Sequence, residues 1–424
     1  MSWSADIPVR ILGTGQSGQA ARALALSKGH DVQLFDEKNG DDPFLVELGP
    51  SLDAPLWIVS PGFDYHHPWM SRLRASGAEV IPELEFGASF LEGDIIAVTG
   101  SLGKTSMVLL LAELLKALGH SVTVSGNSGI PVSQVALESP CADFHLIEAS
   151  SFQLESINQF RPDRAVCLNL YPNHLDRHGD MKTYAEAKAR LFSNMTSEDC
   201  AAWPEDFPIE VETSAQRVFA DQDTLPEVKG SMFVSGPLRE NLAMSLSVLQ
   251  KLPGLTPDLI EKTIREFQFP DHRMQEVDIP DMGRVIDDSK STCYIATRAA
   301  LNLLDGRVHL LMGGQDKDQD PEELRETLQQ KNPFLYLFGA SGKKMQKAWQ
   351  DSVDVCILKD SLEDLMKPLC EHRTDLTLPV LLSPGCASYD QFDGFASRGA
   401  AFQTYMRQLA NSSSETPTFN PRMP

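Results

Sequence analysis

The chain has 424 residues, and its 59 aspartates and glutamates outnumber its 37 lysines and arginines, which gives a formal net charge of −22. This acidic balance disfavours nucleic acids, whose phosphates need a basic partner, and it disfavours docking on an anionic membrane. The length exceeds one ordinary hydrophobic core, so two or three domains are expected. No apolar run is long enough to insert in a membrane, and the N-terminus does not resemble a signal peptide. The seven cysteines lack metal-type spacing, which indicates reduced thiols in the cytoplasm.

Taken in chain order, short apolar runs alternate with helical patterns, and this alternation restarts near residues 94 and 274. Alternation of this kind is typical of parallel sheets covered by helices on both faces. The strands predicted from the apolar runs are Val9–Leu12, Val32–Phe35, Leu56–Ser60, Ile95–Val98, Phe144–Ile147, Ala165–Leu168, Arg284–Ile286, Val308–Met312, Phe334–Phe338, Asp354–Leu358 and Val380–Leu382. The predicted helices are Gln19–Lys28, Ser106–Leu118, Tyr184–Asn194, Asn241–Leu252 and Pro257–Phe267. The polar segment Ala201–Val228 receives no assignment.

These restarts predict an α/β protein of three domains, joined near residues 91 and 270. Residues 1–91 are expected to form a Rossmann-like domain. Residues 92–270 are expected to form a central ATPase domain of the phosphate-loop type with a mostly parallel sheet. Residues 271–424 are expected to form a second Rossmann-like domain, whose Ser-, Thr- and Pro-rich tail from Asn411 onward is predicted to be disordered.

A glycine loop, Gly100-Ser101-Leu102-Gly103-Lys104-Thr105, lies between a predicted strand and a predicted helix. In this context the loop amides and the helix N-terminus can bind phosphates, Lys104 can reach the β and γ oxygens, and Thr105 can bind Mg²⁺. The strict consensus has glycine where Val98 stands, so the loop is a shortened variant. The alternative is a chance turn of the same composition.

A second glycine turn, residues 13–18, is followed by Asp36 at the end of the next predicted strand. This spacing matches the fingerprint of dinucleotide-binding domains and would suit an NAD-dependent dehydrogenase. A second nucleotide-binding loop in the next domain argues against a dehydrogenase, because hydride transfer does not require it. We therefore prefer a turn that recognises the phosphates of a nucleotide-linked substrate, with a purely structural turn as the other alternative.

Three further residues of the central domain are candidates for metal chemistry. Glu148 follows a predicted strand, where a carboxylate is well placed for Mg²⁺, although a glutamate at a helix N-terminus would look the same. His174 follows another strand in a polar segment that could bind metal or substrate, or simply face solvent. Lys188 lies on the apolar side of its predicted helix, so it must either reach solvent with its ammonium group or lose its charge. Of these two outcomes, the residues themselves favour the first.

Polar segments follow three predicted strands of the C-terminal domain: Asp287–Thr292, Gly313–Lys317 and Ser383–Phe392. Ligands of open α/β sheets bind beyond the carboxyl ends of the strands, so we expect these segments to meet at one site. Lys290, Thr292, Lys317 and Ser388 supply hydrogen-bond donors that suit an anionic carboxylate ligand.

From about Val9 to Arg407 the chain resembles the Mur ligases. The resemblance rests on the order and spacing of short segments: Gly100–Ser106, Gly126–Pro131, Glu148–Leu154, Asn173–His178, Asp287–Thr292, Gly313–Lys317 and Leu382–Phe395. It implies an ATP-dependent ligase that forms an amide bond through an acyl phosphate. The member it resembles most uses UDP-N-acetylmuramoyl-L-alanine and D-glutamate as substrates, with ATP and two Mg²⁺ ions, in the cytoplasm and as a monomer.

The resemblance also implies roles for individual residues. Catalysis is expected of Lys104, Glu148, His174 and Lys188. Metal ligands are expected to be Thr105, Glu148, His174 and Lys188, the last as a carbamylated side chain. The expected ATP-binding residues are Gly100, Gly103, Lys104, Thr105, Ser106, Asn241, Arg273 and Asp288. Contacts to the uridine-nucleotide substrate are expected from Gln16, Ser17, Glu37, Lys38, Asn127 and Ser150 in a first domain that binds this substrate. The amino-acid pocket is expected from Lys290, Thr292, Lys317, Ser388 and Phe395 in the C-terminal domain.

Leu102, Ser128, Met244 and Cys293 depart from the residues usual in the family, which indicates a divergent member. Two alternatives therefore stay open beside the first reading. One is a related ligase that adds a different amino acid or acts on folate. The other is a nucleotide-binding relative that has lost ligation. A dehydrogenase is the most distant possibility.

Overall fold

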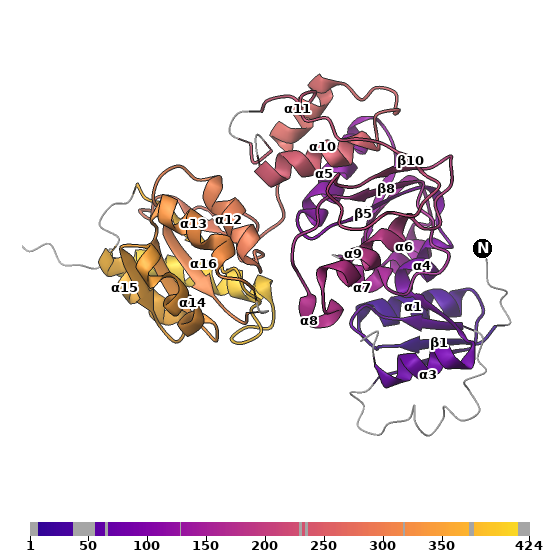
Figure 1. Ribbon diagram of the computed structural model, residues 1–424, viewed down its shortest axis with the longest axis horizontal. Helices are drawn as coiled ribbons and strands as arrows, with labels where there is room; N and C mark the ends of the chain where they lie inside the picture. Colours follow the sequence, from indigo (N-terminus) through magenta and orange to yellow (C-terminus); the bar gives the residue numbers. More distant parts are fainter. Residues whose placement is uncertain are drawn as a thin grey trace, which may run out of the picture. The chain divides into compact units, whose positions relative to one another are not determined.

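The computed structural model describes residues 7–36, 56–63, 67–127, 129–228, 231–233, 236–316, 319–372 and 377–413. The chain divides into two compact units (Figure 1). The first comprises Met1–Tyr171 and His178–Phe267, and the second comprises Pro172–Arg177 and Gln268–Pro424. The first unit contains two sheets and the second contains one.

The first sheet has the strand order β2-β1-β3-β4, and its neighbouring strands are parallel. The strands are β1 (Val9–Leu12), β2 (Val32–Phe35), β3 (Leu56–Val59) and β4 (Glu79–Pro82). Strands β1 and β3 are buried along their whole length, which explains their unbroken apolar runs. Helix α1 (Gln16–Ser27) follows β1, and α3 (Pro68–Ser76) precedes β4.

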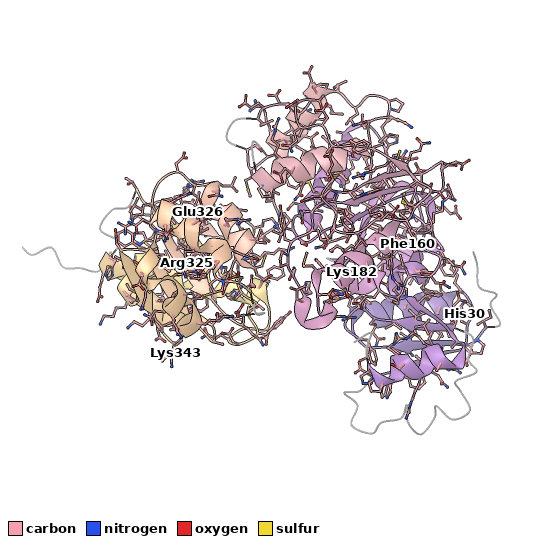
Figure 2. The ribbon with its side chains drawn as sticks, viewed as in Figure 1. His30, Phe160, Lys182, Arg325, Glu326 and Lys343 are labelled. Atoms are coloured by element: carbon pink, nitrogen blue, oxygen red, sulfur yellow. The ribbon has the colours of Figure 1, made fainter. Side chains whose placement is uncertain are left out.

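The second sheet has the order β10-β9-β8-β5-β7-β6 and is also parallel. Its strands are β5 (Glu92–Thr99), β6 (Val122–Gly126), β7 (Cys141–Glu148), β8 (Arg164–Cys167), β9 (Cys200–Ala202) and β10 (Gln216–Arg217). Its helices include α5 (Lys104–Ala117), α7 (Ser151–Leu154), α9 (Met181–Ala189), α10 (Gly236–Ser247) and α11 (Pro257–Glu266). Phe160, labelled in Figure 2, is 3% exposed and belongs to the core on one face of this sheet.

The two sheets of the first unit are joined through packed helices. Helix α1 contacts α6 (Val132–Glu138), and α4 (Glu83–Ala88) contacts both of them (Figure 1). Ala136 of α6 lies in the core of the first sheet, and Leu84 of α4 lies in the core of the second. Leu91 packs against both cores, and together with the packed helices this explains why the first unit is compact although it contains two sheets.

The second unit has one six-stranded sheet of order β11-β12-β16-β13-β14-β15, in which only the β11–β12 pair is antiparallel among the described strands. The strands are β11 (Gln275–Val277), β12 (Val285–Asp287), β13 (His309–Gly313), β14 (Phe334–Phe338), β15 (Val355–Leu358) and β16 (Val380–Leu382). The main helices are α12 (Tyr294–Asn302), α13 (Glu322–Lys331), α14 (Gly342–Trp349), α15 (Met366–His372) and α16 (Phe395–Ser413). Two apolar cores, one on each side of the sheet, hold these helices in place.

Most predicted strands agree with the observed ones to within a few residues, and the α/β class with mostly parallel sheets is confirmed. Helix α16 continues to Ser413, beyond the point where disorder was predicted to begin, because the first proline of the tail is Pro417. Residues 414–424 lie outside the described residues. The unassigned segment contains β9 and β10, two short strands without a clear alternating pattern. No described helix combines the length and the apolar character that a membrane crossing requires.

Candidate active site

The phosphate loop lies between β5 and α5, as the sequence predicts. Its two glycines have positive φ angles, +144° at Gly100 and +85° at Gly103, which only glycine adopts without strain. A Cβ atom at Gly103 would overlap the side-chain nitrogen of Asn241, which comes from α10. Glycine at both positions therefore shapes a turn that places the first turn of α5 against the carboxyl end of the sheet.

The side chain of Asn169, just beyond β8, contacts this loop directly. Its Oδ1 accepts hydrogen bonds from the backbone N–H groups of Ser101 (3.1 Å) and Leu102 (2.9 Å). Its Nδ2 donates to the carbonyl oxygen of Leu102 and to Oδ1 of Asn241. Sequence reasoning missed Asn169, although its position directly after a buried strand was a signal for a polar residue at the site.

The loop is also held by a buried hydroxyl. Ser101, 6% exposed, accepts a hydrogen bond from the backbone N–H of Tyr171 and donates to its carbonyl oxygen, both at 2.9 Å. The hydroxyl of Tyr184, on α9, lies 3.1 Å from the hydroxyl oxygen of Ser101. Sequence analysis assigned no role to Ser101, Tyr171 or Tyr184, because their contacts join segments far apart in the chain.

Two lysines point at the start of the loop. Lys104 Nζ donates to the carbonyl oxygens of Gly100 (2.8 Å) and Ser101 (3.3 Å). Lys188 Nζ donates to the carbonyl of Gly100 (2.9 Å) and to Thr99 Oγ1 (3.4 Å). Positive charge is therefore concentrated where the loop would receive a phosphate group.

Lys188 is 1% exposed, so the expectation that its ammonium group reaches solvent is wrong. The backbone of α9 places it on the buried side, where its Nζ lies 4.6 Å from the ring centre of Tyr184. Burial lowers the pKa of Lys188 to about 8, although the nearby Cys167 and Glu148 oppose this shift. At pH 7 about a tenth of the amine is therefore uncharged, and the uncharged amine is the form that can react with carbon dioxide.

Glu148 ends β7 directly beside β5, where it pairs in register with Val98. It is 3% exposed, and its Oε1 accepts a hydrogen bond from Nδ2 of Asn127 at 3.1 Å. The backbone N–H of Asn127 also donates to the carbonyl of Glu148, at 2.8 Å. Two predicted site residues thus contact each other at the carboxyl edge of the sheet that carries the phosphate loop. Ser150, two residues further on, caps α7 through reciprocal hydrogen bonds with Gln153.

His174 and His178 lie on opposite sides of a unit boundary. His178 is buried in the first unit, where Nε2 lies 3.0 Å from Ser151 Oγ and Nδ1 lies 3.3 Å from Glu155 Oε1. His174 belongs with the second unit and has a positive φ of +56°. The structure therefore gives His178, the last residue of α8 (Leu175–His178), a structural role beside α7, and the role predicted for His174 stays a prediction.

The N-terminal glycine turn is closed by its own acidic residue. Oδ2 of Asp36 accepts hydrogen bonds from the backbone N–H of Thr14 (2.8 Å) and from its hydroxyl (2.6 Å). In dinucleotide-binding domains an acid at this place binds a ribose, so its engagement within the turn favours our reading over a dehydrogenase. Gln16 and Ser17 form the first turn of α1. Glu37 and Lys38 lie outside the described residues.

In the second unit the three polar segments lie side by side at the carboxyl ends of β12, β13 and β16. Ser383 Oγ donates to Oδ2 of Asp288 at 2.8 Å, and Gln315 and Ala387 exchange backbone hydrogen bonds. Burial raises the pKa of Asp288 to about 6, although Ser291, Ser383 and the charge of Arg273 favour the ionised form. The structure thus brings these segments together at one edge of the sheet, as the sequence predicts.

Residues predicted for the amino-acid pocket occupy this edge in part. The ammonium group of Lys290 lies 5.3 Å from the ring centre of Phe395. Ser388 is 2% exposed, and Thr292 is partly buried. Lys317 lies outside the described residues.

Arg398, which sequence reasoning missed, links all three polar segments of the second unit. It is fully buried, and its guanidinium donates to the hydroxyl and carbonyl of Ser289 and to the carbonyls of Cys386 and Gly313. Burial lowers the pKa of Arg398 to about 10, so the group keeps its charge at neutral pH. Its only sequence signal was an arginine on the buried side of an amphipathic helix.

The residues predicted to bind metal fit Mg²⁺ only in part. The hydroxyl of Thr105 and the carboxylate of Glu148 are the oxygen ligands that Mg²⁺ prefers, with phosphates and waters completing its shell. Lys188 as a free amine donates to a carbonyl and does not suit a cation, whereas its carbamate would supply oxygen atoms. Among the described residues, no three His, Cys, Asp or Glu side chains are grouped as a metal site.

Comparisons with known proteins bear on the whole chain. Residues 98–221 match the model of the Mur ligase middle domain. A UDP-N-acetylmuramoylalanine–D-glutamate ligase of Koribacter versatilis is 31% identical, over 95% of this chain and 97% of that protein. The enzyme of the same name from Natranaerobius thermophilus is 33% identical, over 94% and 97%.

Among solved structures, the MurF ligase of Thermotoga maritima in complex with ADP superposes with a TM-score of 0.63 at 18% identity. The aligned region covers 97% of this chain and 98% of that one, which establishes a shared fold. Similarity to the D-glutamate ligases extends over nearly the full length at about one residue in three. The chain belongs to the Mur ligases, the family of ATP-dependent ligases that form amide bonds.

Proposed function

We propose that this protein uses ATP to join D-glutamate to UDP-N-acetylmuramoyl-L-alanine, a cytoplasmic step in the synthesis of peptidoglycan precursors. The observation that carries the proposal is the phosphate loop between β5 and α5, where two positive-φ glycines, Lys104 and Lys188 converge. Relatives named for this reaction match the chain over 97% of their own length.

The reaction needs two consecutive steps. An oxygen of the substrate carboxylate attacks the γ-phosphorus of ATP, so that ADP leaves and an acyl phosphate forms. The amine of D-glutamate then attacks the acyl carbon, loses a proton, and expels inorganic phosphate to leave the amide. Both steps depend on positioning and on neutralising negative charge, and a buried cationic loop provides these conditions.

In the first unit we assign ATP phosphates to Gly100, Gly103, Lys104, Thr105 and Ser106. The hydroxyl of Ser106 is buried, so its contribution is assigned to its backbone N–H in the first turn of α5. Asn241, which lies against Gly103, is assigned to the nucleotide as well.

Thr105 and Glu148 would hold Mg²⁺, and a carbamylated Lys188 would supply oxygen atoms for a second ion. His174 is assigned to the metal sites from the sequence. Bound Mg²⁺ would offset the charge of the triphosphate. The chain itself orients Glu148 through Asn127 and holds Lys188 against Gly100. These contacts fix the orientation of the Glu148 carboxylate and keep Lys188 at the loop.

In the second unit we assign Arg273 and Asp288 to the nucleotide. The pocket for D-glutamate is assigned to Lys290, Thr292, Lys317, Ser388 and Phe395. The ammonium group of Lys290 suits a carboxylate of the amino acid. The buried guanidinium of Arg398 holds the backbone on which Lys290 is carried.

The uridine-nucleotide substrate is assigned to the first sheet and its surroundings. Gln16 and Ser17 start α1, whose N-terminus favours a diphosphate. Asn127 donates a hydrogen bond to Glu148, and Ser150 lies two residues after Glu148 in the chain. Glu37 and Lys38 are assigned to the same substrate from the sequence. The division into domains 1–91, 92–270 and 271–424, with these three roles, and the monomeric state belong to the proposal.

The decisive experiment incubates the purified protein with ATP, Mg²⁺ and UDP-N-acetylmuramoyl-L-alanine and measures phosphate release with each amino acid in turn. Release that strictly requires D-glutamate supports the proposal. Release only with another amino acid, or with a folate acceptor, moves the assignment to a related ligase. No release with any combination, despite nucleotide binding, identifies a relative that has lost ligation.

A further inference from the structure

We infer that Asn169 is a positioning residue of the ATP site, which fixes the backbone of the phosphate loop and the orientation of the Asn241 amide. The inference deepens the proposed function, because it rests on the use of this loop for ATP. Asn169 lies just beyond β8 and is 7% exposed. It needs no contact with the nucleotide to act.

The hydrogen-bonding capacity of the Asn169 amide is completely used at this place. An asparagine side chain offers two acceptor positions on Oδ1 and two donors on Nδ2. Oδ1 receives the N–H groups of Ser101 (3.1 Å) and Leu102 (2.9 Å). Nδ2 donates to the Leu102 carbonyl (2.9 Å) and to Asn241 Oδ1 (2.8 Å). Because a backbone N–H can only donate, the oxygen must face the loop, and the orientation of the amide is settled.

These contacts divide the amides of the loop into two groups. The N–H groups of Ser101 and Leu102 point at Asn169 and are therefore turned away from a phosphate. Of the backbone N–H groups from Ser101 onward, those that can bind phosphate therefore begin at Gly103, in the first turn of α5, where helix geometry leaves N–H groups without intrahelical partners. Asn169 thus sets which part of the loop faces the ligand.

The link from Asn169 to Asn241 fixes a second group of the site. Since Oδ1 of Asn241 accepts from Asn169, its Nδ2 is the group that faces the loop, where it donates to the carbonyl of Leu102 at 3.4 Å. Without the donor on residue 169, the Asn241 amide could rotate. The loop and helix α10 would then no longer be linked through the Asn169–Asn241 hydrogen bond.

The loop has another anchor that does not depend on Asn169. Ser101 Oγ and the backbone of Tyr171 are joined by two hydrogen bonds, and Tyr184 lies against the same hydroxyl. A substitution at residue 169 should therefore leave the fold intact and disturb mainly Leu102 and Asn241. This makes its effect on ligand binding measurable.

The test titrates the full-length protein with a fluorescent methylanthraniloyl derivative of ADP in the presence of Mg²⁺. Asn169→Leu removes all four side-chain hydrogen bonds. Asn169→Asp keeps Oδ1 as an acceptor but replaces Nδ2 by a carboxylate oxygen, which repels the Leu102 carbonyl oxygen and Asn241 Oδ1. Because each variant leaves buried polar groups unpaired, we expect it to bind the ADP derivative roughly 10- to 100-fold more weakly than the wild type at pH 8.

A pH series separates positioning from simple loss of packing. Protonation of the carboxyl introduced by Asn169→Asp restores a donor, so its deficit relative to the wild type should shrink between pH 8 and pH 5.5. The deficit of Asn169→Leu should stay constant. The inference fails if either variant binds within twofold of the wild type, or if the deficit of Asn169→Asp is the same at both pH values.

Asn194→Asp is the matched control. The Nδ2 of Asn194 also donates to two backbone carbonyls, those of Asn158 (3.0 Å) and Phe160 (3.2 Å), but it contacts no residue of the loop. This control should bind the ADP derivative like the wild type, and an equal loss there would overturn the inference. If the wild type binds nucleotide without ligase activity, only the proposed function falls. If the wild type binds none, both fall.

Discussion

Lys104 and Lys188 donate hydrogen bonds to the same atom, the carbonyl oxygen of Gly100, at 2.8 and 2.9 Å. Two ammonium groups on one acceptor repel each other, and the repulsion is relieved when an anion arrives. A triphosphate offers several charged oxygens in place of one carbonyl. This arrangement is therefore suited to release Lys104 toward a nucleotide while Lys188 stays buried on α9.

Replacement of Lys104 by alanine should lower turnover by about a hundredfold or more, because the loop loses the charge that faces the developing phosphate. Phosphate release in the complete reaction is the measurement, with circular dichroism to verify the fold. Lys116→Ala is the control, since Lys116 lies at the other end of α5 with 51% of its side chain exposed. Full activity in Lys104→Ala would remove the loop from the mechanism.

Replacement of Lys188 by alanine should abolish activity, and added short carboxylic acids such as acetate should restore part of it. The small carboxylate would occupy the space left by the side chain and replace the oxygen atoms of a carbamate. The measurement is phosphate release against acid concentration. Lys182→Ala is the control, because Lys182 lies on the same helix with 74% of its side chain exposed (Figure 2). Activity that never returns with any acid would count against carbamylation.

The buried amine also predicts how stability depends on pH. The pKa of Lys188 is lowered from 10.5 to about 8 in the folded chain, so between these pH values the unfolded state binds more protons. The free energy of unfolding should therefore rise with pH across this window, by up to about 3 kcal/mol. Denaturant titrations of wild type and Lys188→Met at pH 7.5 and 10 test this, because the variant should lack the increase. Parallel pH profiles would show that the amine is not buried as described.

Glu83 predicts the opposite pH dependence. Burial raises the pKa of Glu83 from 4.5 to about 7, although Ser133 donates to Oε1, and Oε2 has no partner among the described residues. Here the folded state binds more protons between pH 4.5 and 7, so this group lowers stability as pH rises through that window. Glu83→Gln should stabilise the protein by about 1 to 3 kcal/mol at pH 8 and lose this advantage near pH 4.5.

The measurement for Glu83 is the free energy of unfolding by denaturant at both pH values. Glu138→Gln provides the control, since Glu138 is exposed at the end of α6, the helix whose start contacts Glu83. A destabilised Glu83→Gln at pH 8 would contradict the prediction. It would indicate that the ionised carboxylate is satisfied by groups on the neighbouring helices.

The sequence predicts what depends on local pattern. Buried parallel strands are unbroken apolar runs, so Phe334–Phe338 and Val380–Leu382 agree with the observed β14 and β16. The two-residue strand β10 and the antiparallel β11 carry no such run, and they could not be recognised. Their pairing depends on neighbours distant in the sequence.

The candidate site follows the same division. Gly100, Lys104 and Glu148 were found because strand–loop–helix order places them at a sheet edge. Asn169 and Arg398 were missed because their importance lies in hydrogen-bond partners that are distant in the sequence. These partners are 67 to 72 positions away for Asn169 and 12 to 109 positions away for Arg398. Such partners exist only once the sheet has assembled. The burial of Lys188 likewise required the position of α9 against β5.

The contact of Gly103 with Asn241 has a consequence for divergence within the family. Any side chain at residue 103 would overlap the Asn241 amide, and the φ of +85° there disfavours every residue with a Cβ. Shortening residue 241 removes the overlap but not the backbone strain, so neither change alone compensates fully for the other. A change at either of these two positions therefore alters which side chains the other can accommodate.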